Sequence, residues 1–122
     1  MKRLHILYTL LFIWLLPVTS NGQPAGKEKL RVISYNIWNG FEHDASRRAN
    51  FIKWIKGQQP DILAMTELVG FTEKDLGQLA SEYGHKYYAI VKEEGYPVGI
   101  TSNEPITVVK KQMEGFWQLC IK

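Results

Sequence analysis

The sequence contains very little cysteine, and it has neither a long apolar run nor a region of clustered charge. Cys120 is the single cysteine, so no internal disulfide framework can form. The longest apolar run, from Leu4 to Leu16, falls short of the roughly 20 residues that a membrane-spanning helix needs. The chain also has no internal repeat and no low-complexity tract. These absences argue against a disulfide-stapled scaffold and against a stable membrane span.

Basic residues are scattered along the chain, although its formal net charge is +3 at pH 7. Lys2 and Arg3 lie at the start, and basic and acidic residues nearly balance in the remainder. Short basic pairs at 47–48 and 110–111 are expected on solvated surface. No basic stripe of the kind that dedicated nucleic-acid binders carry is present. Charge therefore does not indicate nucleic acid as a partner.

Residues 1–22 have the layout of a secretory signal peptide. Lys2 and Arg3 form a basic start, an apolar run follows, and Pro17 separates that run from small and polar residues. We therefore expect a secreted or periplasmic protein, with an uncleaved anchor or a buried helix as the alternative. No cysteine stands just after the apolar run, which excludes a lipid-modified N-terminal cysteine. Residues 23–29 are predicted to form a polar linker, and residues 30–122 remain for a domain.

Hydrophobic periodicity predicts alternating strands and helices in this domain. A first strand, which we expect to be buried, covers residues 30–37. The other predicted strands cover residues 62–65, 87–91, 98–102, 106–110 and 115–121. The predicted helices cover residues 47–57, with Asp44 or Ser46 as N-cap, and 72–82, with Thr72 as N-cap. Together they predict a layered α/β unit whose later strands form antiparallel hairpins.

Apolar residues at helical spacing predict the buried face of each helix. In the first helix they are Phe51, Trp54 and Ile55, and Gly57 is expected to end that helix. In the second helix they are Leu76, Leu79 and Ala80. The core is also expected to hold most of the remaining aromatic residues, including Tyr87, Tyr88, Phe116 and Trp117, and a packing role is expected for Tyr96.

Asn36 stands inside an apolar strand, where asparagine is a poor choice. A buried amide needs hydrogen-bond partners, and Glu67 comes just after the second predicted strand. The carboxyl ends of neighbouring strands in an α/β sheet meet where such folds bind ligands. A carboxylate and a carboxamide there suit Mg²⁺, which prefers oxygen ligands. Taken alone, the pair leaves open a plain surface role for Glu67.

Three segments in order, LRVISYNIWNG, QQPDILAMTELVG and YPVGITSNEPI, resemble the endonuclease/exonuclease/phosphatase family, whose members are DNase I-like or exonuclease III-like. The resemblance covers about residues 30–110. It implies the fold class α/β (α+β layered), as the N-terminal half of a four-layer DNase I-like β-sandwich flanked by helices.

The resemblance also implies roles for individual residues. Glu67 matches the magnesium-binding glutamate and Asn36 the asparagine beside it, so both are expected to be catalytic and to form the metal site. Thr66 replaces the glutamine that usually precedes the glutamate. Ser102 and Pro105 match a Ser-x-x-Pro-Ile segment with an expected structural role. The implied reaction is hydrolysis of a phosphate ester with Mg²⁺ (or Mn²⁺), with water activated by a histidine that an aspartate orients.

The loop after Asn36 supplies the expected substrate-binding residues. These are Trp38 and His43, with Phe41 as a further candidate for contact with substrate. The second histidine of this region, His85, follows a glycine and is expected in a surface turn. Neither histidine lies in a segment that matches the general base of the family.

The motifs of the second half of the family are missing from this sequence. Neither Gly-Asp-x-Asn nor Ser-Asp-His, which hold the general base and its partners, occurs. We therefore expect a fragment of a secreted metal-dependent phosphoesterase that is inactive by itself and acts on a phosphate ester. The alternative is an exported half-fold binding module that buries its open face in a dimer or a partner complex. The sequence predicts neither the substrate class nor the oligomeric state.

Overall fold

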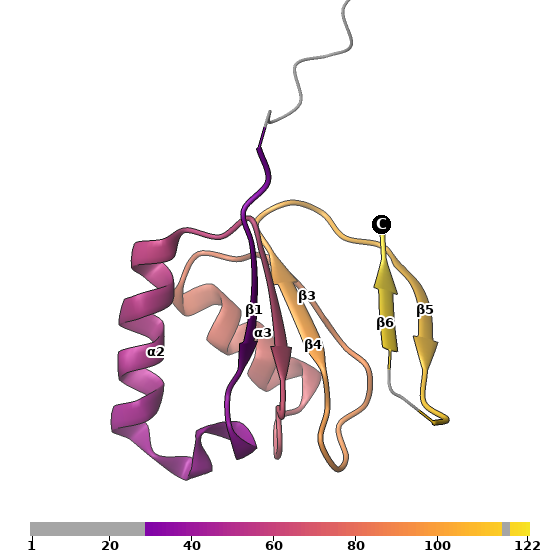
Figure 1. Cartoon of the computed structure of the whole chain (residues 1–122), viewed down its shortest axis with the longest axis horizontal. Coiled ribbons are helices and arrows are strands. Elements are labelled where there is room, and N and C mark those ends of the chain that lie inside the picture. The colour runs from indigo at the N-terminus through magenta and orange to yellow at the C-terminus, as the bar shows by residue number, and fades with distance from the viewer. Residues whose placement is uncertain (1–28, 116–117) are drawn as a thin grey trace, which may run out of the picture.

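The computed structural model describes residues 29–115 and 118–122, which form a layered α/β unit (Figure 1). Strands β1 to β4 and two helices make up the main layer pair, and β5 and β6 form a separate hairpin. The elements are β1 (Val32–Asn36), η1 (Asn39–His43), α2 (Ala45–Gln58), β2 (Ile62–Thr66), α3 (Glu73–Glu82), β3 (Tyr87–Ile90), β4 (Gly99–Ser102), β5 (Val108–Gln112) and β6 (Gln118–Ile121). The predicted order of strands and helices is confirmed.

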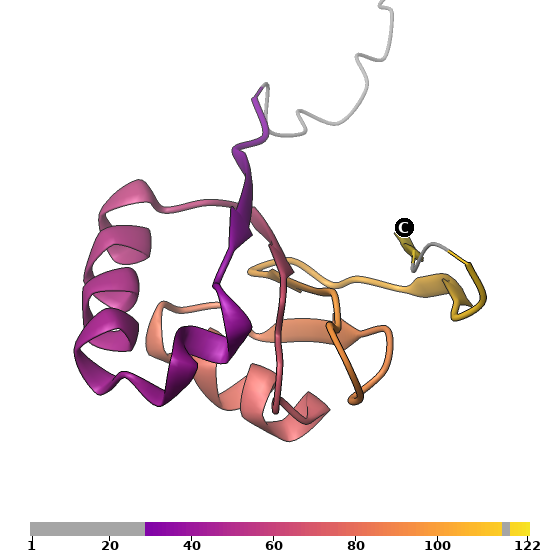
Figure 2. The same ribbon diagram turned by 60° about the horizontal axis from the view of Figure 1, so that its bottom comes forward.

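The four-stranded sheet has the order β1-β2-β4-β3. Strands β1 and β2 are parallel and are connected through α2, whereas β4 pairs antiparallel with both β2 and β3. Asn36 lies opposite Thr66 in the β1–β2 register, so the carboxyl ends of these two strands lie side by side. Figure 2 shows both helices on one side of this sheet and the β5–β6 hairpin at the far end from α2.

The hydrophobic core fills the space between the sheet and the helices. Alternation along β2 points Leu63 and Met65 toward the helices, where both are buried. They pack against a cluster contributed by η1, both helices, β3 and the segments that follow β1 and β2, comprising Ile37, Phe41, Phe51, Ile55, Leu68, Leu76, Leu79 and Ile90. The predicted buried face of α3 is confirmed, since its three apolar residues all belong to the buried core.

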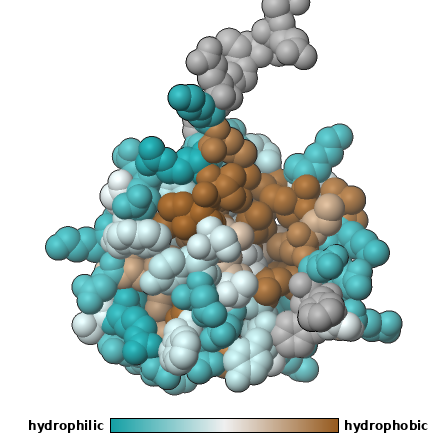
Figure 3. Space-filling view, viewed as in Figure 1, coloured by the Kyte–Doolittle hydropathy of each residue, from teal (hydrophilic) through white to brown (hydrophobic). Residues whose placement is uncertain are grey.

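The other face of the sheet carries apolar side chains that no second layer of described residues covers. The strand register places Val32, Ile62 and Ile100 together on this face. Val32 is 57% exposed, and Figure 3 shows hydrophobic side chains gathered over the strands on the side that faces the viewer. We call this surface the open sheet face, defined by Val32, Ile62, Ala64 and Ile100.

The prediction that the first strand is buried is wrong. Strand β1 is an edge strand with exposed residues at four of its five positions, because β2 pairs with one edge only and no layer of the described chain covers the open sheet face. Helix α2 also differs from the prediction at its end. It continues through Gly57 to Gln58, and Gln59 ends it with a left-handed backbone (φ 48°). Its N-cap is Asp44, whose carboxylate accepts from the amides of Ser46 and Arg47.

Several aromatic residues predicted to lie in the core are partly exposed. Trp54 is 42% exposed on α2, and Tyr87 and Tyr88 are exposed as well. Tyr96, for which the sequence predicts a packing role, is also exposed. Trp54 lies at the rim of the core, where its ring contacts Tyr35 at 5.2 Å between centroids. The opposite correction applies to His85, which is buried and not in a surface turn. Its ring contacts Tyr83 edge-on at 5.1 Å between centroids.

Part of the sequence-based prediction falls outside the described residues. The expected signal peptide (1–22), nearly all of the linker (23–29), Phe116 and Trp117 lie there. Within residues 29–115 and 118–122, none of the helices has the length and apolar character that crossing a membrane requires.

Candidate functional site

The paired ends of β1 and β2 bring Asn36 and Glu67 into direct contact. The Nδ2 atom of Asn36 donates to Glu67 Oε1 at 2.9 Å, and the Asn36 Oδ1 atom accepts from the amide of Trp38 at 2.8 Å. Both ends of the Asn36 side chain are therefore used. This explains the asparagine at the end of an otherwise apolar strand, because its amide joins the chain after β1 to the carboxylate after β2.

The segment after Asn36 forms a left-handed turn. Six consecutive residues, Trp38 to His43, have φ between 47° and 66°. For residues other than glycine, this backbone costs roughly 1–2 kcal/mol per residue, so it persists only where surrounding contacts hold it. The Asn39-Gly40 pair is the one sequence signal of this turn, and it predicts neither the length nor the handedness of the turn.

Two backbone amides of the left-handed turn (residues 38–43) are directed at Glu67. The amide of Asn39 donates to Glu67 Oε2 at 3.1 Å, and the amide of Gly40 donates to the Glu67 carbonyl oxygen at 2.8 Å. With the Asn36 bond to Oε1, both carboxylate oxygens of Glu67 are oriented by one segment of chain. Glu67 itself has a left-handed backbone (φ 60°) and is partly buried. Sequence reasoning missed Asn39 and Gly40, because backbone donors leave no side-chain pattern.

The chemistry of Glu67 fits a hard divalent cation in part. Each of its carboxylate oxygens accepts one of these hydrogen bonds and keeps further lone-pair capacity. Mg²⁺ is commonly held by one or two protein carboxylates, with water and substrate phosphate completing its shell. Among the described residues, no group of three or more His, Cys, Asp or Glu side chains gathers into a metal site. Glu67 is thus one suitable ligand and not a complete cage.

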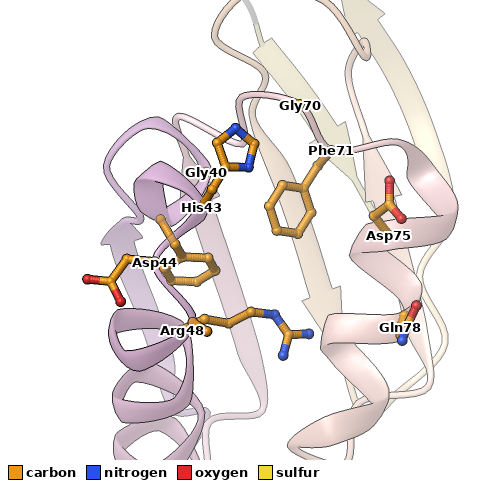
Figure 4. A pocket seen from close by; sticks show the side chains of 10 residues that line it. Gly40, His43, Asp44, Arg48, Gly70, Phe71, Asp75 and Gln78 are labelled. Atoms are coloured by element: carbon orange, nitrogen blue, oxygen red, sulfur yellow. The ribbon is translucent and has the colours of Figure 1, made fainter.

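The two predicted substrate-binding residues lie in the left-handed turn but are not brought together. Trp38 is 57% exposed, and its indole Nε1 donates to Glu42 Oε1 at 3.0 Å. His43 instead lines a cavity of about 380 Å³ between the turn, the start of α2 and α3 (Figure 4). In that view the His43 and Phe71 rings and the Arg48 side chain border the cavity. Neither Asn36, Trp38 nor Glu67 lines it.

Phe41, the further candidate for substrate contact, belongs to the core. Its ring is 2% exposed and contacts Phe51 and Phe71, with centroids 5.2 Å and 6.3 Å away. The prediction of a substrate contact is therefore wrong for Phe41. Its burial instead anchors the middle of the left-handed turn to the helices.

Known proteins place this arrangement in a family. The sequence profile described as the Endonuclease/Exonuclease/phosphatase family matches residues 33–117. The chain belongs to the endonuclease/exonuclease/phosphatase family. The match includes β1 from its second residue onward, β2 and the left-handed turn, and therefore includes both Asn36 and Glu67.

Two solved structures with a DNase I-like fold are similar to this chain. A humanized TDP2 of D. rerio carrying 14 mutations superposes with a TM-score of 0.50 at 17% identity, over 68% of this chain and 34% of that one. An AP endonuclease from Archaeoglobus fulgidus gives a TM-score of 0.50 at 27% identity, over 71% and 32% of the two chains. The fold is thus DNase I-like, and the chain spans about a third of the length of either neighbour. No curated protein matches the chain.

The third segment that resembled the family has the structural role expected of it. Ser102 is buried at the end of β4, where its hydroxyl donates to the Asp61 carbonyl oxygen at 3.1 Å. The same hydroxyl oxygen accepts from the Glu104 amide at 3.0 Å. Ser102 thereby connects the start of β2 to the turn that leads to Pro105. This contact lies at the opposite end of β2 from Glu67.

Proposed function

We propose that this chain is the N-terminal part of a secreted or periplasmic metal-dependent phosphoesterase and is inactive by itself. Its family has a hydrolase fold and is generally metal-dependent. The observation that carries the proposal is the Glu67 carboxylate at the paired ends of β1 and β2, oriented by Asn36 and by the Asn39 amide. The substrate would be a phosphate ester, cleaved as a diester or a monoester.

The residues of this chain would prepare one side of the reaction. Glu67 would hold Mg²⁺ (or Mn²⁺), while Asn36 would keep the carboxylate oriented and Trp38 would offer an exposed aromatic surface to the substrate. When bound, the metal would polarise a phosphoryl oxygen and stabilise the leaving oxygen. Activation of water needs a general base. His85 is buried away from Glu67, and His43 borders a separate cavity, so neither suits that role.

The extent of the family match supports the proposal that the chain needs further residues to act. The chain spans about a third of the length of each solved neighbour. Apolar side chains on the open sheet face, such as Val32, are exposed. A second layer on that face would bury them. We expect that layer to carry the general base.

The activity of the chain tests the proposal directly. With bis-p-nitrophenyl phosphate and Mg²⁺, the 122-residue chain should hydrolyse no more substrate than buffer does. Hydrolysis that disappears in Glu67→Gln would contradict the proposed inactivity.

The gene beyond the Lys122 codon should continue, in the same or a shifted frame, into Gly-Asp-x-Asn and Ser-Asp-His. In the longer protein Glu67→Gln should lower the rate at least about a hundredfold. A stop codon with nothing related downstream would contradict the proposal.

Export requires its own experiment. Residues 1–22 would direct export and be removed, with cleavage after Ser20 or Gly22. N-terminal sequencing of the protein from a secreting host should begin at Asn21 or Gln23. A product that keeps Met1 and stays in the cytoplasm would contradict export.

The open sheet face favours a second candidate function, an exported half-fold module that binds a partner or a second copy. The face is apolar, and Leu30, Ile62, Ile106 and Ile121 line a shallow cavity beside it. Exposed apolar patches of this kind mark interaction sites or missing structure. Static light scattering separates the two candidates. A tight, monodisperse dimer would support the module, and an aggregate or a loosely packed monomer would support the enzyme fragment.

A further inference from the structure

The left-handed turn (residues 38–43) bonds both the side chain and the backbone of Glu67. Its Asn39 amide reaches the Glu67 side chain, and its Gly40 amide reaches the Glu67 carbonyl oxygen. Because the turn bonds both the backbone and the carboxylate, the orientation of the Glu67 carboxylate depends on the position of the turn. A turn that moved would release Oε2 and loosen the peptide that carries it.

Gly40 allows the turn to approach this closely. A Cβ atom at position 40 would lie 2.1 Å from the Val69 carbonyl oxygen, which is far inside contact distance. Gly40 also has φ 63°, a conformation that glycine adopts without strain. Any larger residue there would push the turn away from the segment that follows Glu67.

Phe41 holds the turn from the other side. Its side chain is buried among the aromatic rings of α2 and the β2–α3 connection, and its amide donates to the Ile37 carbonyl oxygen at 3.1 Å. The Phe41 carbonyl oxygen in turn accepts from the Asp44 amide at 2.9 Å, just before α2 begins. The turn is thus fixed at its base, its middle and its exit, although its backbone is strained.

We propose that the left-handed turn is a preformed support for Glu67, with Gly40 and Phe41 as its positioning residues. The backbone strain in the turn serves to direct the Asn39 amide at Oε2 while Asn36 holds Oε1. The inference rests on the proposed function in one respect, namely that Glu67 is the carboxylate that meets the metal. Gly40 and Phe41 touch neither metal nor substrate and act through Glu67.

The first measurement needs no metal. In ¹⁵N-labelled chain, the Asn39 and Gly40 amides should exchange slowly with solvent, and the Asn39 amide proton should move upfield in Glu67→Gln. A charged acceptor forms the stronger hydrogen bond, so loss of the charge should weaken it. Fast exchange at both amides, or an Asn39 signal unchanged in Glu67→Gln, would overturn the proposal even if no variant at position 40 folds.

The second measurement uses Mn²⁺ as a paramagnetic probe of the same chain. In the native chain Mn²⁺ should broaden amide signals next to Glu67, and Glu67→Gln should abolish this broadening. Gly40→Ala should weaken Mn²⁺ binding about 10- to 100-fold, as changes in the groups that orient a metal ligand commonly do. The matched control is Gly84→Ala, because Gly84 has φ +94° but no atom within 4 Å of an added Cβ. Gly84→Ala therefore strains the backbone at a positive φ but brings the added Cβ atom into contact with no neighbouring atom.

The outcomes separate the inference from the proposed function. Equal Mn²⁺ broadening in folded Gly40→Ala and in the native chain would overturn the inference and leave the metal role of Glu67 standing. A slowly exchanging, Glu67-dependent Asn39 amide with no Mn²⁺ broadening in the native chain would overturn the metal role and leave the turn as the support of Glu67. Equal loss in Gly40→Ala and Gly84→Ala would assign the effect to general destabilisation and overturn the inference.

Discussion

His85 shows how much one buried polar side chain can connect. Its Nε2 atom lies 2.9 Å from the Pro60 carbonyl oxygen, which only accepts, so Nε2 carries a proton. In the neutral ring Nδ1 then accepts from the Thr101 hydroxyl at 2.8 Å, and the Thr101 oxygen is free to accept from Tyr83, 3.0 Å away. The chain of bonds runs from Tyr83 to Pro60 through two other residues. A histidine after a glycine gives no sign of this in the sequence, because the partners are distant along the chain.

Thr101 is the centre of this chain of bonds, so its loss should be costly. Thr101→Val keeps the shape of the side chain but leaves the Tyr83 hydroxyl and the His85 Nδ1 atom without their shared partner, while His85 Nε2 keeps its bond to Pro60. We expect about 1–3 kcal/mol of lost folding free energy, measured by urea unfolding. Thr107→Val is the control, since Thr107 is exposed and should change stability by no more than about 0.5 kcal/mol. Equal effects of the two changes would contradict this account.

Tyr83 should make the protein sensitive to alkali. Burial raises the pKa of Tyr83 to about 12, against its hydrogen bond to Thr101, which lowers it. A raised pKa favours the protonated folded state, so its contribution is complete below pH 10 and is lost as pH rises toward 12. The free energy of unfolding should therefore fall by up to about 2–3 kcal/mol over this window. In Tyr83→Phe this part of the fall in unfolding free energy at alkaline pH should be absent. If the fall is unchanged in this variant, groups other than Tyr83 cause it.

Residue patterns predicted the Asn36–Glu67 contact but not the contacts that support it. The two side chains stand at the ends of predicted neighbouring strands, and parallel pairing brings them together. The Asn39 and Gly40 donors belong to the backbone, whose direction depends on φ values that side-chain identity does not encode. His43 and Trp38 were close in sequence, yet the left-handed turn sends them to different surroundings.

Helix α3 is defined by local signals, whereas α2 is shaped by what surrounds it. Thr72 and Asp75 form a reciprocal capping box, and the apolar positions of α3 follow helical spacing without exception. In α2, Gly57 stays helical. Arg31 donates to the Gln58 carbonyl oxygen at the end of this helix, and Arg48 donates to the Glu82 carboxylate on α3. Both contacts join residues that are distant in the sequence. The sequence therefore predicted the start and buried face of α3 correctly but misplaced the end of α2 and the exposure of Trp54.

The capping box should contribute measurably to stability. Thr72→Ala should cost about 1 kcal/mol of folding free energy, because the Asp75 amide loses its acceptor at the helix start. Ser81→Ala is the control in the same helix. Its hydroxyl donates back to the Gln78 carbonyl oxygen, a bond that helices do without, so this change should be neutral or slightly stabilising. Thermal or urea unfolding of both variants measures the difference, and equal costs would contradict the cap.

Acid should weaken the same cap. The side-chain and backbone hydrogen bonds from Thr72 hold the pKa of Asp75 below its usual value of 3.8. A lowered pKa means that the contribution of Asp75 is present above pH 3.8 and is lost as pH falls through the folded-state value. The cost of Asp75→Asn should therefore shrink below pH 3.8. A cost that stays constant from neutral pH to pH 2 would rule out the charge of Asp75 as its source.

At the scale of the whole molecule, the four-stranded sheet has helices on one face, and no second layer among residues 29–115 and 118–122 covers the other. The sequence predicted the order of the elements and the layered α/β class, because periodicity reports which residues need burial. It did not predict that β1 would be exposed. An apolar strand at an edge has the same periodicity as one in the middle, and what covers it lies elsewhere in the chain or outside it.

The open sheet face should govern how the chain behaves in solution. We expect the isolated chain to bind a hydrophobic dye and to associate at tens of micromolar concentration, by light scattering. The double change Val32→Ser and Ile62→Ser should reduce both effects. Val109→Ser is the matched control, because Val109 is exposed on the separate β5–β6 hairpin. If association persists in the double variant but is lost in Val109→Ser, the surface through which the chains associate lies on the hairpin.

The strand order determines when each strand can pair while the ribosome synthesises the chain. Strand β4 is made after β1, β2 and β3, yet it lies inside the sheet and joins β2 to β3. Until Ser102 has left the exit tunnel, β3 has no strand partner and only the β1–β2 pair can form. The nascent chain therefore exposes an unfinished sheet with open edges until β4 is available, which is when a chaperone is most needed.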